Sequence, residues 1–106
     1  MSEDSKSPGA GGLVRLSDAQ IDERLPTVPD WALRDGKLCR KLTFGNFVEA
    51  FGFMTQVALL AETANHHPDW SNVYNRVDIA LNTHDVGGIS ERDFALAATI
   101  DAVVGG

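Results

Sequence analysis

The three histidines of the chain are its strongest candidates for chemistry. His66 and His67 are adjacent and stand directly before Pro68, and His84 lies further along, just ahead of the Gly87-Gly88 pair. Imidazole changes its charge near neutral pH, so it can give up or take a proton under physiological conditions. The pattern therefore predicts an acid–base site made from two separate segments of the chain.

Two carboxylates stand where they could serve these histidines. Glu62 precedes His66 by four residues, a spacing that makes the two side chains neighbours if the helix continues that far. A carboxylate in that position would hold the orientation of the imidazole ring. Asp93 opens the last predicted helix with Arg92 beside it, and we expect both to join the same cleft.

A metal site and a nucleophilic site are alternatives that the residues support less well. Three imidazoles can bind zinc, but adjacent histidines on one element point in different directions, and no acidic or cysteine ligand shows a metal spacing. The single cysteine, Cys39, lies in a predicted strand, and no Gly-x-Ser-x-Gly elbow or phosphate-binding loop occurs. We expect neither a metal nor a cofactor. Surface histidines without a function are the plainest remaining alternative.

Two aromatic residues, Trp70 and Tyr74, flank the histidine pair on its carboxyl-terminal side. They could stack on a flat heterocycle or close the hydrophobic core, and their spacing favours the core. The residues alone thus indicate an acid–base cleft without identifying its substrate.

Composition limits the class of protein. The chain has 106 residues, 43% of them hydrophobic, and a formal net charge of −6. These values predict one folded domain over residues 13–106 with a flexible tail over residues 1–12. A nucleic acid is not an expected direct partner of an acidic chain, and no apolar run is long enough for a membrane span. A lone cysteine and the absence of a signal peptide favour the cytoplasm, with the nucleus open to so small a protein.

Hydrophobic periodicity and capping signals predict seven elements. They are a helix over 17–25, strands over 31–34 and 37–44 joined by Asp35-Gly36, a helix over 46–64, strands over 71–74 and 77–83, and a helix capped by Ser90. Antiparallel hairpins covered by helices predict an α+β two-layer sandwich, a four-stranded antiparallel sheet with three helices on one face.

The same periodicity predicts which faces of the helices and strands are buried. In the long helix, the stripe of residues expected to face the core is Phe47, Phe51, Met54, Ala58 and Ala61, and Ala50, Val57 and Leu60 broaden this apolar face. In the last helix it is Phe94, Ala97, Ala98 and Val104, with Ile100 close to it. The strand over 37–44 alternates in both registers, so its inner face stays open. Asn75 and Arg76 are expected to turn the chain between the last two strands.

The second half of the chain resembles a known family. The residues that carry the resemblance are FGFMTQVALLAETANHHPDWSNVYNRVDIALNTHDVGGISERDFALAATID. They are similar to the pterin-4a-carbinolamine dehydratases, a family also described as the dimerisation cofactor of a homeodomain transcription factor. The matching residues are an acidic residue, a His-His-Pro triplet, an aromatic residue, a third histidine and an acidic residue opening the last helix, that is, Glu62, His66, His67, Pro68, Tyr74, His84 and Asp93.

The resemblance implies the same α+β fold and an activity. The activity is removal of water from 4a-hydroxytetrahydrobiopterin or a related pterin, giving the quinonoid dihydropterin that a reductase then recycles. By resemblance, His66, His67 and His84 form the acid–base site, and Glu62 and Asp93 orient the histidines or the pterin. The further candidates for binding the substrate are Asn65, Trp70, Asn82, Thr83 and Arg92.

The resemblance also implies partners. The family forms dimers and tetramers through sheet edges and the long helix, so a homodimer or homotetramer is expected. A transcription-factor dimerisation domain is a second expected partner, bound through the helix over 46–64. Two residues depart from the family pattern: Asn65 stands where an acidic residue is common, and Asn82 stands where serine is common. Both keep the ability to hydrogen-bond.

Overall fold

The computed structural model describes residues 13–105, so the tail predicted over residues 1–12 lies outside the described residues. The elements follow one another as α1 (Asp18–Arg24), η1 (Leu25–Thr27), β2 (Ala32–Arg34), β3 (Lys37–Thr43), α2 (Phe47–Ala64), β4 (Asp69–Val73), β5 (Arg76–Leu81), η2 (His84–Val86) and α3 (Glu91–Gly105). The η elements are single turns of 3₁₀ helix. All seven elements predicted from the sequence are present.

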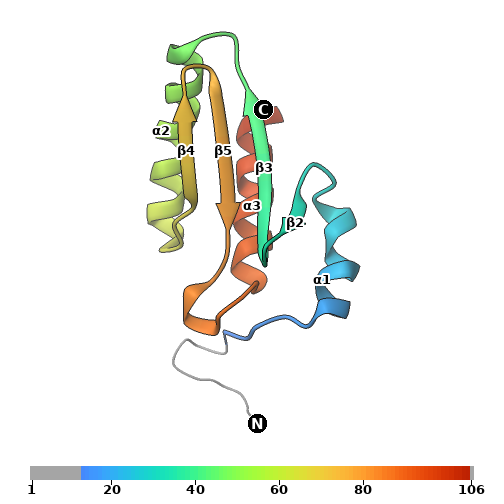
Figure 1. Cartoon of the computed structure of the whole chain (residues 1–106). Helices are drawn as coiled ribbons and strands as arrows, with labels where there is room; N and C mark the ends of the chain where they lie inside the picture. The colour runs from blue at the N-terminus through green and yellow to red at the C-terminus, as the bar shows by residue number, and fades with distance from the viewer. Residues whose placement is uncertain (1–12, 106) are drawn as a thin grey trace.

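The four strands form one antiparallel sheet in the order β2-β3-β5-β4. Figure 1 looks onto the uncovered face of this sheet, with α2 and α3 behind it and α1 beside β2. Ile21 of α1 is buried in the same hydrophobic core as the helix-facing residues of the sheet. The predicted α+β two-layer architecture is confirmed.

Alternate residues of the two central strands face the helices. On β3 these are Leu38 and Leu42, and on β5 they are Val77, Ile79 and Leu81, all buried. A strand turns successive side chains to opposite faces, so this burial settles the inner face of β3. The residues at the intervening positions, Cys39, Lys41, Asp78 and Ala80, lie on the uncovered face. Arg40 shares the helix side of β3 with Leu38 and Leu42 and pairs there with Asp101 of α3.

Local signals read from the sequence set the ends of several elements. Ser17 and Gln20 form the expected reciprocal cap on α1, and Asn46 caps α2. Asp35 and Gly36 have φ angles of 51° and 76°, as a two-residue hairpin turn requires. The turn between β4 and β5 was predicted one residue too late, because Tyr74 takes the left-handed conformation with φ of 52°.

The predicted inner face of α2 is wrong. The residues that α2 buries are Ala50, Phe53, Val57 and Ala61. Ala61 belonged to the expected stripe and Ala50 and Val57 to its broadened margin, whereas Phe53 was not expected in the core. Phe47 and Phe51 are instead 45% and 53% exposed. This helix carries apolar side chains on more than one face, so periodicity alone could not select the buried one. In α3, Ala98 is likewise exposed and Leu96 is buried against expectation, whereas Ile100, expected close to the inner face, is buried.

Within residues 13–105, no helix combines the length and the apolar character that crossing a membrane would need.

Candidate active site

The three histidines line one hollow of about 380 Å³, which we call the histidine hollow. It lies where the end of α2, the loop after β5 and the start of α3 meet, at the lower end of the sheet in Figure 1. Its lining residues are Asn65, His66, His67, Pro68, Asp69, Asn82, Thr83, His84, Asp85 and Arg92. Two segments separated by a hairpin therefore bring their imidazoles together.

His66 is the buried member of the set, with 8% of its surface exposed. Its Nε2 lies 2.7 Å from Oδ1 of Asp93, a carboxylate that is fully buried. The other oxygen of Asp93 accepts hydrogen bonds from the Thr83 hydroxyl at 2.8 Å and from the Ser90 backbone N–H at 2.9 Å. Asp93 thus contacts the His66 ring on its buried side and is not among the residues that line the hollow.

His67 is exposed and pairs with a different carboxylate. Its Nε2 lies 2.8 Å from Oε1 of Glu62. The pair expected from the sequence, Glu62 with His66, is therefore wrong. The helix stops at Ala64, and Asn65 enters the left-handed conformation with φ of 52°. This reversal breaks the four-residue spacing and directs His66 toward α3 instead.

His84 comes from the loop after β5. Its Nε2 lies 4.0 Å from Oδ2 of Asp69, which also accepts a hydrogen bond from Lys37 Nζ at 3.3 Å. Asp69 and Asp85 line the histidine hollow but were not predicted from the sequence. For Asp69 a signal existed, since it directly follows the His-His-Pro triplet.

The predicted binding residues divide into two groups. Asn65, Asn82, Thr83 and Arg92 line the histidine hollow as expected, whereas Trp70 does not and packs partly buried against the core. Tyr74, at the β4–β5 turn, lies at the opposite end of the sheet in Figure 1 and is 60% exposed.

The pairing of each histidine with its own carboxylate bears on metal binding. The three pairs are His66 with Asp93, His67 with Glu62 and His84 with Asp69. Across residues 13–105, no three histidine, cysteine or carboxylate side chains are placed to hold one metal ion. The arrangement suits proton transfer, because each ring has a carboxylate partner at one nitrogen.

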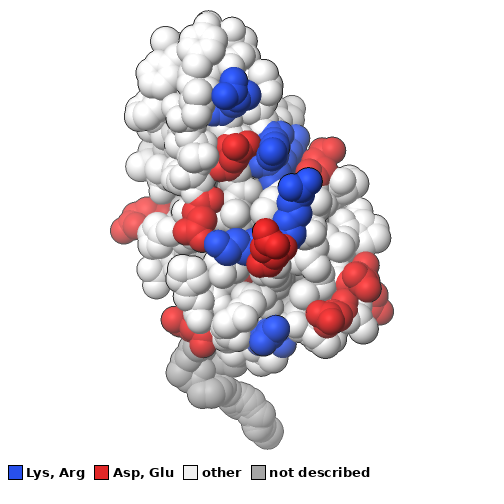
Figure 2. All heavy atoms as spheres, viewed as in Figure 1, with Lys and Arg blue, Asp and Glu red and all other residues white. Residues whose placement is uncertain are grey.

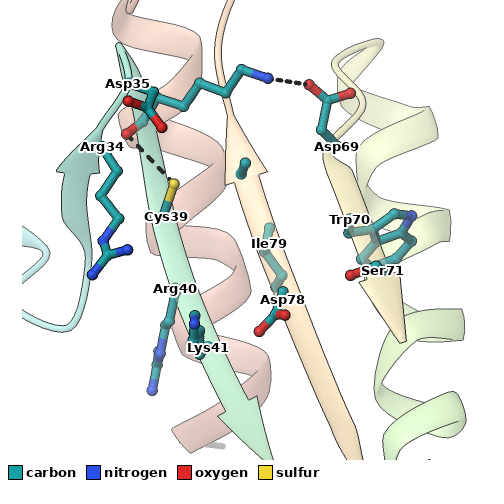
Figure 3. Close-up of a pocket in the computed structure, with 12 residues that line it drawn as sticks. Arg34, Asp35, Cys39, Arg40, Lys41, Asp69, Trp70, Ser71, Asp78 and Ile79 are labelled. Atoms are coloured by element: carbon teal, nitrogen blue, oxygen red, sulfur yellow. Dashed lines mark hydrogen bonds and ion pairs between the residues drawn. The ribbon is translucent and has the colours of Figure 1, made fainter. Parts of the chain in front are cut away.

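A second hollow, of about 450 Å³, lies on the uncovered face of the sheet (Figure 3). Basic and acidic side chains alternate over this face rather than forming a field of one sign (Figure 2). Cys39 stands within it, and burial raises the pKa of its thiol. Asp69 lines both hollows, and its contact with Lys37 spans β4 and β3 (Figure 3).

Comparison with known proteins identifies the family. Residues 14–103 match the family model described as pterin 4 alpha carbinolamine dehydratase, a range that includes every residue of the histidine hollow. The chain belongs to this family. The family membership inferred from the His-His-Pro segment is thereby confirmed.

Individual relatives agree with this assignment. A Rhodospirillum rubrum protein provisionally named pterin-4-alpha-carbinolamine dehydratase is 55% identical over 93 residues, which cover 86% of this chain and 97% of the relative. A Chloroflexus aurantiacus protein with the same provisional name is 53% identical, covering 88% of this chain and 100% of the relative.

Solved structures give the same result. A transcriptional coactivator/pterin dehydratase from Brucella melitensis superposes with a TM-score of 0.80 at 42% identity, covering 84% of this chain and 97% of the other. A pterin dehydratase-like protein, described as a RuBisCO assembly factor in the alpha-carboxysome, superposes with a TM-score of 0.59 at 26% identity. That match covers 71% of this chain and 87% of the other.

Proposed function

We propose that this chain catalyses the dehydration of a pterin 4a-carbinolamine, with 4a-hydroxytetrahydrobiopterin as the representative substrate. The products are water and the quinonoid dihydropterin, so the protein would serve tetrahydrobiopterin recycling. One observation carries the proposal: three imidazoles line a single hollow, each within 4.0 Å of its own carboxylate, in a member of the pterin dehydratase family.

The reaction needs one proton given and one proton taken. The C4a–O bond breaks with both electrons going to oxygen, and an acid supplies the proton that makes the leaving group water. The N5–H bond then gives its proton to a base, and its electrons complete the C4a=N5 double bond. No electrons pass to or from the pterin as a whole. Each well-placed proton transfer accelerates such a step by about 10²–10⁴-fold.

The residues of the histidine hollow divide these tasks. His66, His67 and His84 are the groups that exchange protons with the substrate. Glu62 and Asp69 stabilise the exposed rings, at 2.8 Å from His67 and 4.0 Å from His84. The polar edge of the pterin would form hydrogen bonds with three further lining residues, the amides Asn65 and Asn82 and the guanidinium of Arg92.

The test is a stopped-flow dehydration assay with freshly generated carbinolamine. We expect His84→Ala to lose about 10²–10⁴ of the enzymatic acceleration and to keep its fold, because the His84 side chain is 76% exposed. Tyr74→Ala is the matched control, since Tyr74 is also exposed but lies at the far end of the sheet. Wild-type protein that leaves the spontaneous rate unchanged would rule out the proposal.

We propose a second role, protein interaction through α2. Phe47 and Phe51 are exposed on this helix with ring centroids 5.6 Å apart, and Val48 and Leu59 are 78% and 67% exposed. Such a patch favours contact with another protein, and the Brucella melitensis relative is described as a coactivator as well as a dehydratase. The expected occupants are a second copy of the chain, giving a dimer or tetramer, and a transcription-factor dimerisation domain.

Light scattering at several concentrations tests the self-association. Phe51→Glu should lower the mass of the particle. Gln56→Glu serves as the charge control, because Gln56 is exposed on the same helix but points about 140° away from Phe51. A Phe51→Glu protein with the wild-type mass would place the interface elsewhere. Binding of a candidate transcription-factor dimerisation domain should be lost in Phe51→Glu and retained in His84→Ala.

A further inference from the structure

Two buried hydroxyl groups have no part in the proposed proton transfers: that of Thr83, which lines the histidine hollow, and that of Ser90, which does not. Ser90 is fully buried and Thr83 is 4% exposed. Their oxygens lie 2.7 Å apart. Thr83 was expected to bind substrate, yet its hydroxyl is engaged by Ser90 and by Asp93. These hydroxyls therefore act on protein groups.

Each hydrogen in this network can be assigned. Thr83 has a single hydroxyl hydrogen, and it is donated to Oδ2 of Asp93 at 2.8 Å. The bond between the two hydroxyls must then be donated by Ser90 to Thr83. The Ser90 oxygen in turn accepts a hydrogen bond from the Arg92 backbone N–H at 3.2 Å. The hydrogens are thus donated in one direction, from the Arg92 backbone to Ser90, from Ser90 to Thr83 and from Thr83 to Asp93, and we call this chain the hydroxyl relay.

The carboxylate of Asp93 receives the end of this relay. Its Oδ2 accepts from Thr83 and from the Ser90 N–H, and it lies in the first turn of α3, where negative charge is stabilised. An ionised carboxylate has no hydrogen to donate. The remaining oxygen, Oδ1, can therefore only accept from His66 Nε2 across their 2.7 Å contact.

We propose that Thr83 and Ser90 are positioning residues that, through Asp93, hold His66 with its hydrogen on Nε2. This places the exchangeable site of the ring at Nδ1, which makes no hydrogen bond to any residue in the described part of the chain. A pterin in the histidine hollow would then meet a single defined nitrogen of His66. The inference rests on the proposed function for its catalytic meaning, but the position of the hydrogen can be measured without activity.

The first test is long-range ¹H–¹⁵N NMR of the full chain with labelled histidine, which distinguishes the two ring nitrogens. Neutral His66 should carry its hydrogen on Nε2. In Asp93→Asn the amide group can present N–H to the ring, so the hydrogen should move to Nδ1. A wild-type ring with the hydrogen on Nδ1 would overturn the proposal, as would an Asp93→Asn protein that folds and keeps the Nε2 form.

The second test isolates the hydroxyl relay with a matched pair of variants. Thr83→Val keeps the shape of the side chain and removes the hydroxyl, whereas Thr83→Ser keeps the hydroxyl. We expect Thr83→Val to give a mixture of His66 tautomers and to lower kcat about tenfold or more with little change in KM, and Thr83→Ser to restore both. Equal tautomer ratios in Thr83→Val and wild type would refute the relay.

These experiments distinguish failure of the proposed function from failure of the positioning of His66. A wild-type protein with the Nε2 form of His66 but no dehydratase activity would refute the proposed function and leave the positioning of His66 intact. An active enzyme whose His66 carries its hydrogen on Nδ1 would do the reverse.

Discussion

The carboxylate–histidine pairs at the site offer a direct comparison between burial and exposure. Asp93 lies 2.7 Å from His66 and Glu62 lies 2.8 Å from His67, so the two contacts have nearly the same length. The Asp93 side chain is 0% exposed, whereas that of Glu62 is 80% exposed. We predict that Asp93→Ala destabilises the fold severely and that Glu62→Ala barely changes it.

The magnitude follows from the groups that lose their partner. Asp93→Ala removes the acceptor from three buried donors: the His66 ring, the Thr83 hydroxyl and the Ser90 N–H. Leaving a buried donor unpaired costs about 1–3 kcal/mol. Because Thr83 can turn its hydroxyl toward Ser90, two donors stay without an acceptor, and we expect a total of about 2–6 kcal/mol. An exposed pair contributes about 0–1 kcal/mol, which sets the expected loss for Glu62→Ala.

Urea denaturation measures both variants. With a slope of about 1–3 kcal/mol per molar urea, Asp93→Ala should lower the midpoint by about 2 M, and Glu62→Ala by less than about 0.5 M. Wild-type stability is expected at about 5–15 kcal/mol, so the Asp93 variant should remain measurable at low urea. Equal losses of stability in the two variants would contradict the argument that burial decides the strength of these pairs.

Three further predictions concern the scaffold. Phe53→Ala should destabilise the fold by about 3–5 kcal/mol, because Phe53 is only 5% exposed. Phe51→Ala on the same helix should cost under about 1 kcal/mol, because Phe51 is 53% exposed. Similar urea midpoints for the two variants would contradict the assigned core face. Gly36→Ala should destabilise the fold by about 1 kcal/mol, since the φ angle of Gly36 is 76°. Gly52 lies in α2 with open space around it, so Gly52→Ala should stabilise the fold by about 0.5–1 kcal/mol. Thermal melting temperatures that shift in the same direction would refute this pair of predictions. Burial raises the pKa of the Cys39 thiol, so the stability linked to the protonated thiol is present at neutral pH and is lost as the pH rises through the raised pKa. A disulfide reagent should react more slowly with the folded than with the urea-unfolded protein at pH 8. Equal reaction rates would contradict the raised pKa.

Most of the architecture could be predicted from the sequence, because local signals mark the element ends. The Asp35-Gly36 turn and the Ser17 cap are of this kind, since each depends on residues adjacent in the chain. The buried face of α2 could not be predicted in the same way. Phe51 and Phe53 are equally apolar, and only the packing of the helix against the sheet selects Phe53 for the core.

The site shows the same division. The convergence of His66 and His84 on one hollow follows the sequence expectation. The carboxylate partner of each histidine could not be predicted from the sequence, because it depends on one backbone reversal at Asn65. Because of that reversal, Glu62 pairs with His67, and His66 pairs with Asp93, which lies 27 positions further along the chain. Asp69 was missed for a related reason, since its approach to His84 depends on the pairing of β4 with β5.

The central claim is that the histidine hollow holds the pterin between the imidazoles of two segments. The most direct measurement is an NMR titration of histidine-labelled protein with a stable pterin such as dihydrobiopterin. The account predicts that the ring signals of His66, His67 and His84 all shift with one common dissociation constant, while the Tyr74 ring signals stay in place. Saturable binding that leaves the three histidine signals unmoved would contradict it.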